Sequence, residues 1–260
     1  MAKKISNRGQ VTIWIIIAVV LVASIVLFFL IYQEPKLIKP AESEGVFDMQ
    51  SFLDSCVKEY VEEIVDIIIP QGGFTKPENY KIFDNTKIEY ICENIGFYEP
   101  CIQQHPLLIR EIKGEIGNYI VPRIESECLP ELKREIEKRN GEIEFLGPLT
   151  LSVDLGEDRV YVNVEKESKI TKNKETRKYK EFKFEVINPV YNLASIASEI
   201  ASQEAQYCYF EYVGYKILYP RYTITKFSTS DSVKIYTIED TKSKKKMNIA
   251  IRGCAVPAGI

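Results

Sequence analysis

A long uncharged stretch near the start of the chain limits what this sequence can fold into more than any other feature. From Val11 to Tyr32 there is no charged residue, and the only hydroxyl side chains before Tyr32 are Thr12 and Ser24. As a helix, this stretch of about 22 residues spans about 30 Å, the thickness of the hydrocarbon core of a membrane. A cleaved secretory signal is the alternative, but the small residues it needs, Ala23 and Ser24, lie in the middle of the run. The sequence therefore predicts a transmembrane helix over residues 11–32.

The charges on either side of this run predict its orientation. Lys3, Lys4 and Arg8 precede it, whereas residues 33–47 contain charges of both signs and two prolines. Because basic residues stay on the cytoplasmic side, residues 1–10 are expected to form a cytoplasmic leader and residues 33–47 a stalk. We expect a single-pass protein of the cell membrane whose folded part is extracellular, with the lipid bilayer as a partner.

Six cysteines follow the predicted span, an even number in a compartment that favours disulfides. The second and third flank a turn-rich stretch, and the first and fourth lie on apolar helical faces. The pairs that we expect are Cys92 with Cys101, Cys56 with Cys128, and Cys208 with Cys254. The other pairings stay open at this stage, because spacing alone does not choose among them.

A metal site is the alternative use of these cysteines. Cys101 and His105 are four residues apart, and Cys92 or Cys128 would complete a tetrahedral set. However, Pro106 places His105 just before a helix start, and the chain contains no pair of cysteines with CxxC spacing. His105 is therefore expected to be a surface or capping residue.

Composition and motifs restrict the function classes. The chain has 34 basic and 37 acidic residues, a net charge of -3, which disfavours a nucleic-acid partner. It has one histidine and no phosphate-binding loop, nucleophile elbow or zinc-protease motif. We predict no catalytic residue, metal or cofactor. The alternative is an envelope enzyme or metal-binding protein that uses carboxylates or a cysteine set with His105. The acidic group Asp154, Glu157 and Asp158 is one such candidate, although a solvated turn explains it better.

Residues 48–140 are expected to be a helical, cysteine-containing part. Asp48 can cap a helix that runs to about Ile69, with a core-facing stripe along one side. Pro70 and the two glycines after it then end the helix.

A second helical region begins near Pro106, where apolar residues recur at every fourth position. The residues of this stripe are Leu108, Ile112, Ile116, Ile120, Ile124, Cys128, Leu132 and Ile136. One straight helix would spread them around its surface, because four residues exceed one turn by about 40°. Pro122 and Pro130 are therefore expected to kink or break the region into two or three linked helical segments.

Residues 141–260 are expected to be an antiparallel sheet part, because the hydrophobic period changes to two. The expected strands are three runs within residues 149–186, then Tyr207–Tyr219, Tyr222–Phe227, Val233–Ile238 and Met247–Arg252. A helix with a small-residue face is expected over Pro189–Gln206. The fold class is therefore α+β: an N-terminal transmembrane helix, a helical part, and an antiparallel sheet with a covering helix.

Two groups of side chains are candidates for surface contacts. The tyrosines Tyr207, Tyr209, Tyr212, Tyr215, Tyr219 and Tyr222 suit either a sugar or partner surface or the packing of an amphipathic sheet, and we favour packing. The basic runs Lys166–Lys183 and Lys242–Lys246 fall on expected hairpin connections, where charge usually serves solubility.

The segment Arg8, Gly9, Gln10, Val11 and Thr12 resembles the class III, prepilin-like signals of archaeal surface proteins. The resemblance implies cleavage between Gly9 and Gln10 on the cytoplasmic side, and packing of the apolar helix in a filament. The sequence departs from the pilin pattern at Trp14, where pilins usually carry a glutamate. That departure weakens filament assembly more than membrane anchoring.

The layout beyond the anchor is similar to a group of uncharacterised single-pass membrane proteins of small-genome archaea. The stretches that carry the resemblance are the helix Ser51–Ile69 with Gln71–Gly73, the segment Tyr98–Leu107, the run Tyr207–Pro220 and the tail Ile249–Pro257. It implies location and architecture but no activity. We therefore expect an envelope protein with a structural or interaction role, in contact with a partner protein or with copies of itself.

Overall fold

The computed structural model describes residues 20–22, 24, 48–96 and 98–253. The residues from Asp48 onward form one compact unit. Its start coincides with the expected end of the stalk. The expected division between residues 140 and 141 is not a boundary between compact units, because strands from both sides of it share a sheet.

The predicted anchor falls almost entirely outside the described residues. Of residues 11–32, only Val20–Val22 and Ser24 are described, and they are helical. The leader with Gly9 and Gln10 and the stalk at residues 33–47 are not described either. Among the described residues, no helix has the length and apolar character needed to cross a membrane.

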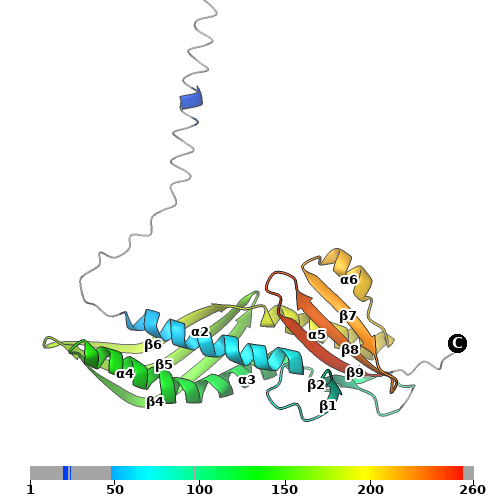
Figure 1. The fold of residues 1–260 in the computed structure, drawn as a ribbon, viewed down its shortest axis with the longest axis horizontal. Helices are drawn as coiled ribbons and strands as arrows, with labels where there is room; N and C mark the ends of the chain where they lie inside the picture. Colours follow the sequence, from blue (N-terminus) through cyan, green and yellow to red (C-terminus); the bar gives the residue numbers. More distant parts are fainter. Residues whose placement is uncertain (1–19, 23, 25–47, 97, 254–260) are drawn as a thin grey trace, which may run out of the picture. The chain divides into compact units, whose positions relative to one another are not determined.

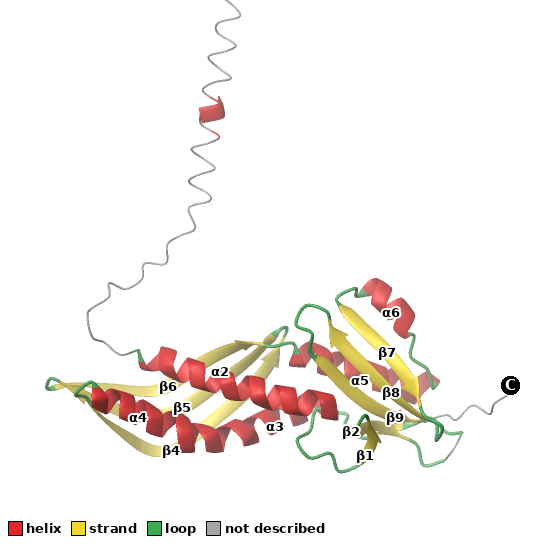
Figure 2. Cartoon of the chain, in the orientation of Figure 1, coloured by secondary structure: helices red, strands yellow, loops and turns green. Residues whose placement is uncertain are grey.

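The fold is α+β, with two separate sheets in place of the single antiparallel sheet that we expected (Figures 1 and 2). The first sheet has the order β4 (Glu142–Gly156), β5 (Arg159–Lys172), β6 (Glu175–Ile187) and is antiparallel throughout. The second has the order β1 (Tyr80–Phe83), β2 (Thr86–Glu93), β9 (Lys246–Arg252), β8 (Val233–Asp240), β7 (Tyr222–Ser228), with β3 (Ile102–Gln103) also paired to β2. This second sheet is mixed, because β2 and β9 are parallel.

Strands β1 to β3 lie in the part of the chain that we expected to be helical, so that expectation was wrong for residues 80–103. The five residues from Ile88 to Cys92 on β2 are all buried. A strand that is covered on both faces loses the polar and apolar alternation of a half-exposed strand. The segment Ile88–Cys92 therefore carries no period-two signal, and its pairing comes from distant parts of the chain.

Helix α2 (Met49–Ile68) forms where the sequence predicts it. Asp48 caps it, because its carboxylate accepts the backbone N–H of Gln50 at 3.1 Å. The short 3-10 turn η1 (Ile69–Gln71) follows, and Gly72 ends it with a φ of 85°, which favours glycine.

The expected linked helical segments are present, and the changes from one segment to the next fall beside Pro122 and Pro130. Helix α3 (Leu108–Arg123), the π-helical segment η2 (Ile124–Cys128) and helix α4 (Leu129–Lys138) follow one another without a loop. The π turn inserts one extra residue. That residue rotates the following helix back by about 100° and so offsets the drift of the apolar stripe around the helix. All eight residues of the four-residue repeat are buried. Both prolines are exposed, so water can bond the carbonyl groups that lack a partner there.

Helices α2 and α3 lie side by side on the three-stranded sheet, as Figure 1 shows. Val162 on β5 pairs with Val153 on β4 and with Phe184 on β6, so these side chains share the helix-covered face. The residues between them, such as Tyr161 and Glu185, face the opposite side and are exposed. The expectation of antiparallel strands with one wet face is confirmed for this sheet.

Helix α5 (Val190–Tyr207) covers one face of the six-stranded sheet, as predicted. Ala194, Ala197 and Ala201 are fully buried there, and their small size allows close approach to the strands. The other face has its own small core, formed by Ile88, Tyr90, Val233, Ile235 and Ala250.

The segment expected as a strand over Tyr207–Tyr219 is not a strand. Tyr207 ends α5, Cys208 takes a left-handed conformation with a φ of 56°, and residues Tyr212–Leu218 form helix α6. The β propensity of tyrosine is therefore outweighed here by a local helix cap, described below.

Two disulfides join the elements in the pairing that the sequence favoured. Cys56 on α2 is bonded to Cys128 at the end of η2, and Cys92 on β2 is bonded to Cys101. Cys208 is also disulfide-bonded. Its expected partner, Cys254, lies outside the described residues. Among the described residues there is no free cysteine.

One arginine connects the two sheets. Arg221, before β7, donates to both oxygens of Asp158 in the β4–β5 turn, at 2.7 and 2.5 Å, and its Nε donates to Asp240 at 2.8 Å. Burial opposes ionisation of Asp240. The hydrogen bonds from Arg221, Ser243 and the backbone of Lys242 outweigh it and lower the pKa of Asp240 to about 2. Asp240 is thus held as a carboxylate at neutral pH.

We expect the two described disulfides to contribute unequally to stability. They close loops with sequence separations of 72 and 9 residues. In the chain-entropy model, the disulfide that closes the longer loop stabilises the folded state by about 4 kcal/mol, and the one that closes the shorter loop by about 3 kcal/mol. Urea unfolding of Cys56→Ala/Cys128→Ala should therefore show a lower midpoint than that of Cys92→Ala/Cys101→Ala. The reverse order would contradict this loop-length account.

The Asp240 pKa predicts a pH-dependent effect of Asp240→Asn. The folded pKa of about 2 lies below an unfolded value of about 3.9, so the carboxylate stabilises the fold above about pH 4 and its contribution disappears as the pH falls through about 2. Asp240→Asn should cost about 2 kcal/mol at pH 5 and little at pH 2, measured by urea unfolding. Asp154→Asn, at a carboxylate that is 71% exposed, is the control and should cost much less. An equal loss for Asp240→Asn at both pH values would contradict the assignment.

Candidate interaction surface

Helix α6 and the residues that flank it carry several exposed apolar side chains. None of the residues Tyr212–Leu218 is buried. Val213, Ile217 and Leu218 have exposed fractions of 57%, 78% and 75%. We define the α6 surface by these three residues and the three exposed tyrosines that flank the helix in sequence, Tyr207, Tyr209 and Tyr219. Groups of exposed apolar side chains are candidates for interaction sites in folded domains.

The residue before the helix explains why α6 forms. Glu211 accepts the backbone N–H groups of Val213 and Gly214, both at 3.1 Å, through one carboxylate oxygen. Its other oxygen accepts the Tyr209 hydroxyl at 2.7 Å. The Tyr209 hydrogen bond and these backbone bonds lower the pKa of Glu211, while the same contact raises the pKa of Tyr209. The ionised carboxylate of Glu211 therefore caps the N-terminus of α6.

Phe210 anchors the helix to the unit beneath it. Its side chain is 1% exposed, and its ring lies 5.5 Å from that of Tyr215 and 6.1 Å, edge-on, from that of Tyr236. Burial raises the pKa of Tyr215, which marks the inner side of α6. The inner side is thus packed on β7 and its neighbours, whereas Ile217 projects from the outer side.

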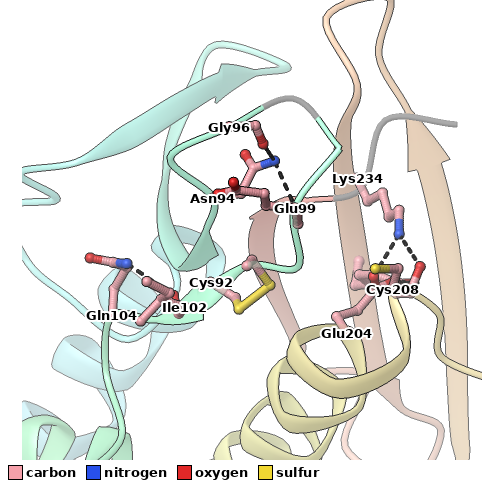
Figure 3. The surroundings of a disulfide bond; sticks show 11 residues. Cys92, Asn94, Gly96, Glu99, Ile102, Gln104, Glu204, Cys208 and Lys234 are labelled. Atoms are coloured by element: carbon pink, nitrogen blue, oxygen red, sulfur yellow. Dashed lines mark hydrogen bonds and ion pairs between the residues drawn. A yellow bond between two sulfur atoms is a disulfide. The ribbon is translucent and has the colours of Figure 1, made fainter. Parts of the chain in front are cut away.

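A buried ionic network supports this region from below. Glu204 on α5 is 1% exposed, and its carboxylate accepts the Lys234 ammonium group at 2.5 Å and the Tyr236 hydroxyl at 2.5 Å. Figure 3 shows the Lys234 side chain reaching both Glu204 and the backbone carbonyl of Cys208, which lies at 2.7 Å. Burial, followed by the contact with Glu204, raises the pKa of Tyr236. Because the network bonds Cys208 directly, it holds the turn that leads from α5 into α6.

Lysine side chains border the α6 surface. Lys226 on β7 lies over the rings of Tyr209 and Tyr212, with its ammonium nitrogen 5.3 Å from each ring centre. Lys216 is exposed on α6 itself. The surface therefore combines an apolar centre with tyrosine hydroxyls and positive charge at its edge.

The alternative metal site at His105 is contradicted. Cys92, Cys101 and Cys128 are all held in disulfides and leave no thiolate for a metal. In the described part of the chain, no group of three or more histidine, cysteine or acidic side chains is arranged to hold a metal ion.

His105 lies just before α3, as expected, but it is only partly exposed and its side chain does not cap that helix. Its side chain is 20% exposed, and its Nδ1 lies 2.6 Å from a carboxylate oxygen of Glu111. Its ring lies 4.5 Å from that of Phe74, and its Nε2 is 3.6 Å from buried Glu89. His105 thus connects the start of α3 to the loop after η1 and to β2.

The acidic group at the β4–β5 turn does not converge on a common point. Asp154 pairs with Lys113 on α3, and Asp158 pairs with Arg221. These two carboxylates therefore join the sheet to neighbouring elements, and the structure does not bring them together with Glu157 as a calcium or acid–base site.

The second basic run, Lys242–Lys246, is not only exposed charge on a loop, because one of its lysines forms ion pairs with a helix. Lys245, in the β8–β9 connection, pairs with Glu62 at 2.9 Å and also with Asp66, both on α2. The hydrogen bonds to Asp66 and Glu62 outweigh burial and raise the pKa of Lys245. This connection is therefore attached to the helix layer.

We favoured packing over a partner surface for the six tyrosines, because the sequence pattern placed them on two amphipathic strands. The structure divides them: Tyr222 is buried, Tyr212 and Tyr215 are half-buried, and Tyr207, Tyr209 and Tyr219 are exposed. A signal was present in Glu211 followed by Gly214, which fits an acidic N-cap before a short helix.

No protein-family model, curated protein or solved structure matches this chain. The α6 surface is therefore interpreted from its own geometry.

We expect Phe210 and Ile217 to contribute very differently to stability, although they lie seven residues apart. Phe210→Ala removes a buried ring and should cost about 3 to 5 kcal/mol. Ile217→Ala removes a side chain that is 78% exposed and should cost about 0.5 kcal/mol or less. Urea unfolding of both variants gives the comparison. A large loss in Ile217→Ala would mean that the outer side of α6 is part of the core.

Proposed function

We propose that this chain is a membrane-anchored protein of the cell envelope that acts by binding, with its folded unit outside the cell and the α6 surface as its contact site. The cysteine chemistry carries the proposal. Every described cysteine is disulfide-bonded. Such bonds persist in oxidising compartments and are rare in the cytosol. An export route is therefore needed, and the apolar run at residues 11–32 supplies a candidate for it.

The basic residues before the apolar run and the position at which the folded unit begins support the same topology. Lys3, Lys4 and Arg8 precede the apolar run and favour a cytoplasmic N-terminus. The compact unit begins at Asp48, which leaves residues 33–47 as the connection. The resemblance to single-pass membrane proteins of archaea agrees with this arrangement.

The α6 surface supports a binding role. Val213, Ile217 and Leu218 would lose water contact on association, which is the main source of favourable free energy when surfaces bind. A pilin-like version of the proposal adds cleavage between Gly9 and Gln10 and lateral assembly through the apolar helix. Trp14, in place of the usual glutamate, counts against that version.

Protease treatment of whole cells that express the full chain tests the topology. Protease added outside should remove the folded unit and leave a fragment that contains residues 1–32, and a cytosolic protein in the same cells should stay intact. The disulfides should be present before lysis, as judged by blocking free thiols in intact cells. A folded unit that survives until the cells are opened, or reduced cysteines, would contradict the proposal.

The N-terminus of the same purified chain decides between its two versions. An N-terminus that retains Arg8 and Gly9 supports a signal anchor. An N-terminus at Gln10 supports prepilin processing and makes filament assembly the question to pursue.

A further inference from the structure

The chemistry of the α6 surface fits one occupant better than others. Aliphatic side chains form its centre, at Val213, Ile217 and Leu218, and the hydroxyl-bearing rings of Tyr209 and Tyr219 stand beside them. Aliphatic groups flanked by tyrosine are typical of segments that lie in the interface of a bilayer, where rings sit at the depth of the headgroups.

The charges around the surface agree with a lipid headgroup layer. Lys216 and Lys226 border the apolar centre, and lysine stems can lie along acyl chains while their ammonium groups reach phosphate. Two acidic residues lie next to the helix. Glu211 has its carboxylate engaged by two backbone N–H groups and by Tyr209, and Glu199 on α5 is hydrogen-bonded to Tyr215 on the inner side of α6. The lysines therefore supply positive charge at the edge of the surface, while both nearby carboxylates are engaged by the protein itself.

The length of chain outside the described unit favours the same occupant. Residues 33–47 connect the predicted span to Asp48, and 15 residues reach at most about 50 Å when fully extended. The unit therefore cannot leave the neighbourhood of its own bilayer. This tether gives the membrane a high effective concentration at every exposed face.

The size of the α6 surface argues against a second copy as its main occupant. A helix of seven residues is about 10 Å long, and a stable protein interface needs about 800 Å² from each partner. A shallow contact with a bilayer needs no such area, since the tether already holds the two together.

We propose that the α6 surface docks on the headgroup region of the membrane in which the chain is anchored, with Val213, Ile217 and Leu218 entering the acyl boundary. The inference rests on the proposed function, because it needs the anchor at residues 11–32. It adds a fixed orientation: the six-stranded sheet meets the bilayer through α6, and the rest of the folded unit is held against the surface rather than away from it.

A single tryptophan on α6 tests the docking in the full chain. The only native tryptophan, Trp14, lies in the predicted span, so Trp14→Phe is the background for all variants. Ile217→Trp adds an indole at the centre of the surface. Ile82→Trp is the matched control, because Ile82 is 60% exposed on β1. That strand lies at the other end of the sheet order from β7 and, in Figure 1, well apart from α6.

The full chain is reconstituted in phosphatidylcholine vesicles, with and without bromine on the acyl chains, and again with phosphatidylglycerol added. In the Ile217→Trp variant, the emission should shift to shorter wavelength and brominated chains should quench most of it. Phosphatidylglycerol should strengthen both effects in proportion to its content. The Ile82→Trp variant should keep the emission of a solvated indole in every vesicle.

Each other outcome overturns the docking. Equal, solvent-like emission in both variants means that α6 faces water. A blue shift without bromine quenching, which grows with the ratio of protein to lipid, means that a second copy covers the surface. Flotation of the same vesicles tests the anchor separately. A chain that does not float refutes the proposed function, whereas one that floats without quenching refutes only the docking.

Discussion

The parallel pairing of β2 with β9 is the constraint on which the rest of the folded unit depends. The two strands are far apart in the sequence, at Thr86–Glu93 and Lys246–Arg252. Parallel strands need a long crossover connection, and here that connection contains α3, the π turn, α4, the whole three-stranded sheet and α5. The pair therefore closes one long loop, and the three-stranded sheet lies within that loop. Arg221 fixes how the inserted sheet meets the outer one, through Asp158 and Asp240.

The proposed contact and the stability of the unit use different sides of the same short helix. Phe210 and Tyr215 pack inward and depend on the sheet, whereas Ile217 faces solvent. The buried group of Glu204, Lys234 and Tyr236 holds the turn before the helix. A buried ion pair adds little net stability, because desolvation offsets the attraction, but it penalises other arrangements of the same segment. The geometry of the α6 surface thus depends on a network that takes no part in the proposed contact.

Particular residues show which features of the fold could be predicted from the sequence. Asp48 predicts the start of α2, because an N-cap is a local interaction between neighbours along the chain. The four-residue repeat from Leu108 to Ile136 predicts its buried face, although not the π turn that keeps the face aligned. The cysteine spacing favoured both described pairs. β2 was missed because burial on both faces removes the alternation by which a strand is recognised.

The sequence by itself determined the apolar run, the ends of α2 and α5, the half-exposed strands of the three-stranded sheet and the favoured cysteine partners, because each of these depends on neighbours along the chain or on simple periodicity. Only the tertiary structure decided that β2 pairs with β9, that Asp158 and Asp240 share Arg221, and that Ile217 remains exposed. These outcomes depend on which parts of the chain, distant in sequence, pack against one another. Burial results from that packing, so it cannot be inferred from the local propensity of a residue.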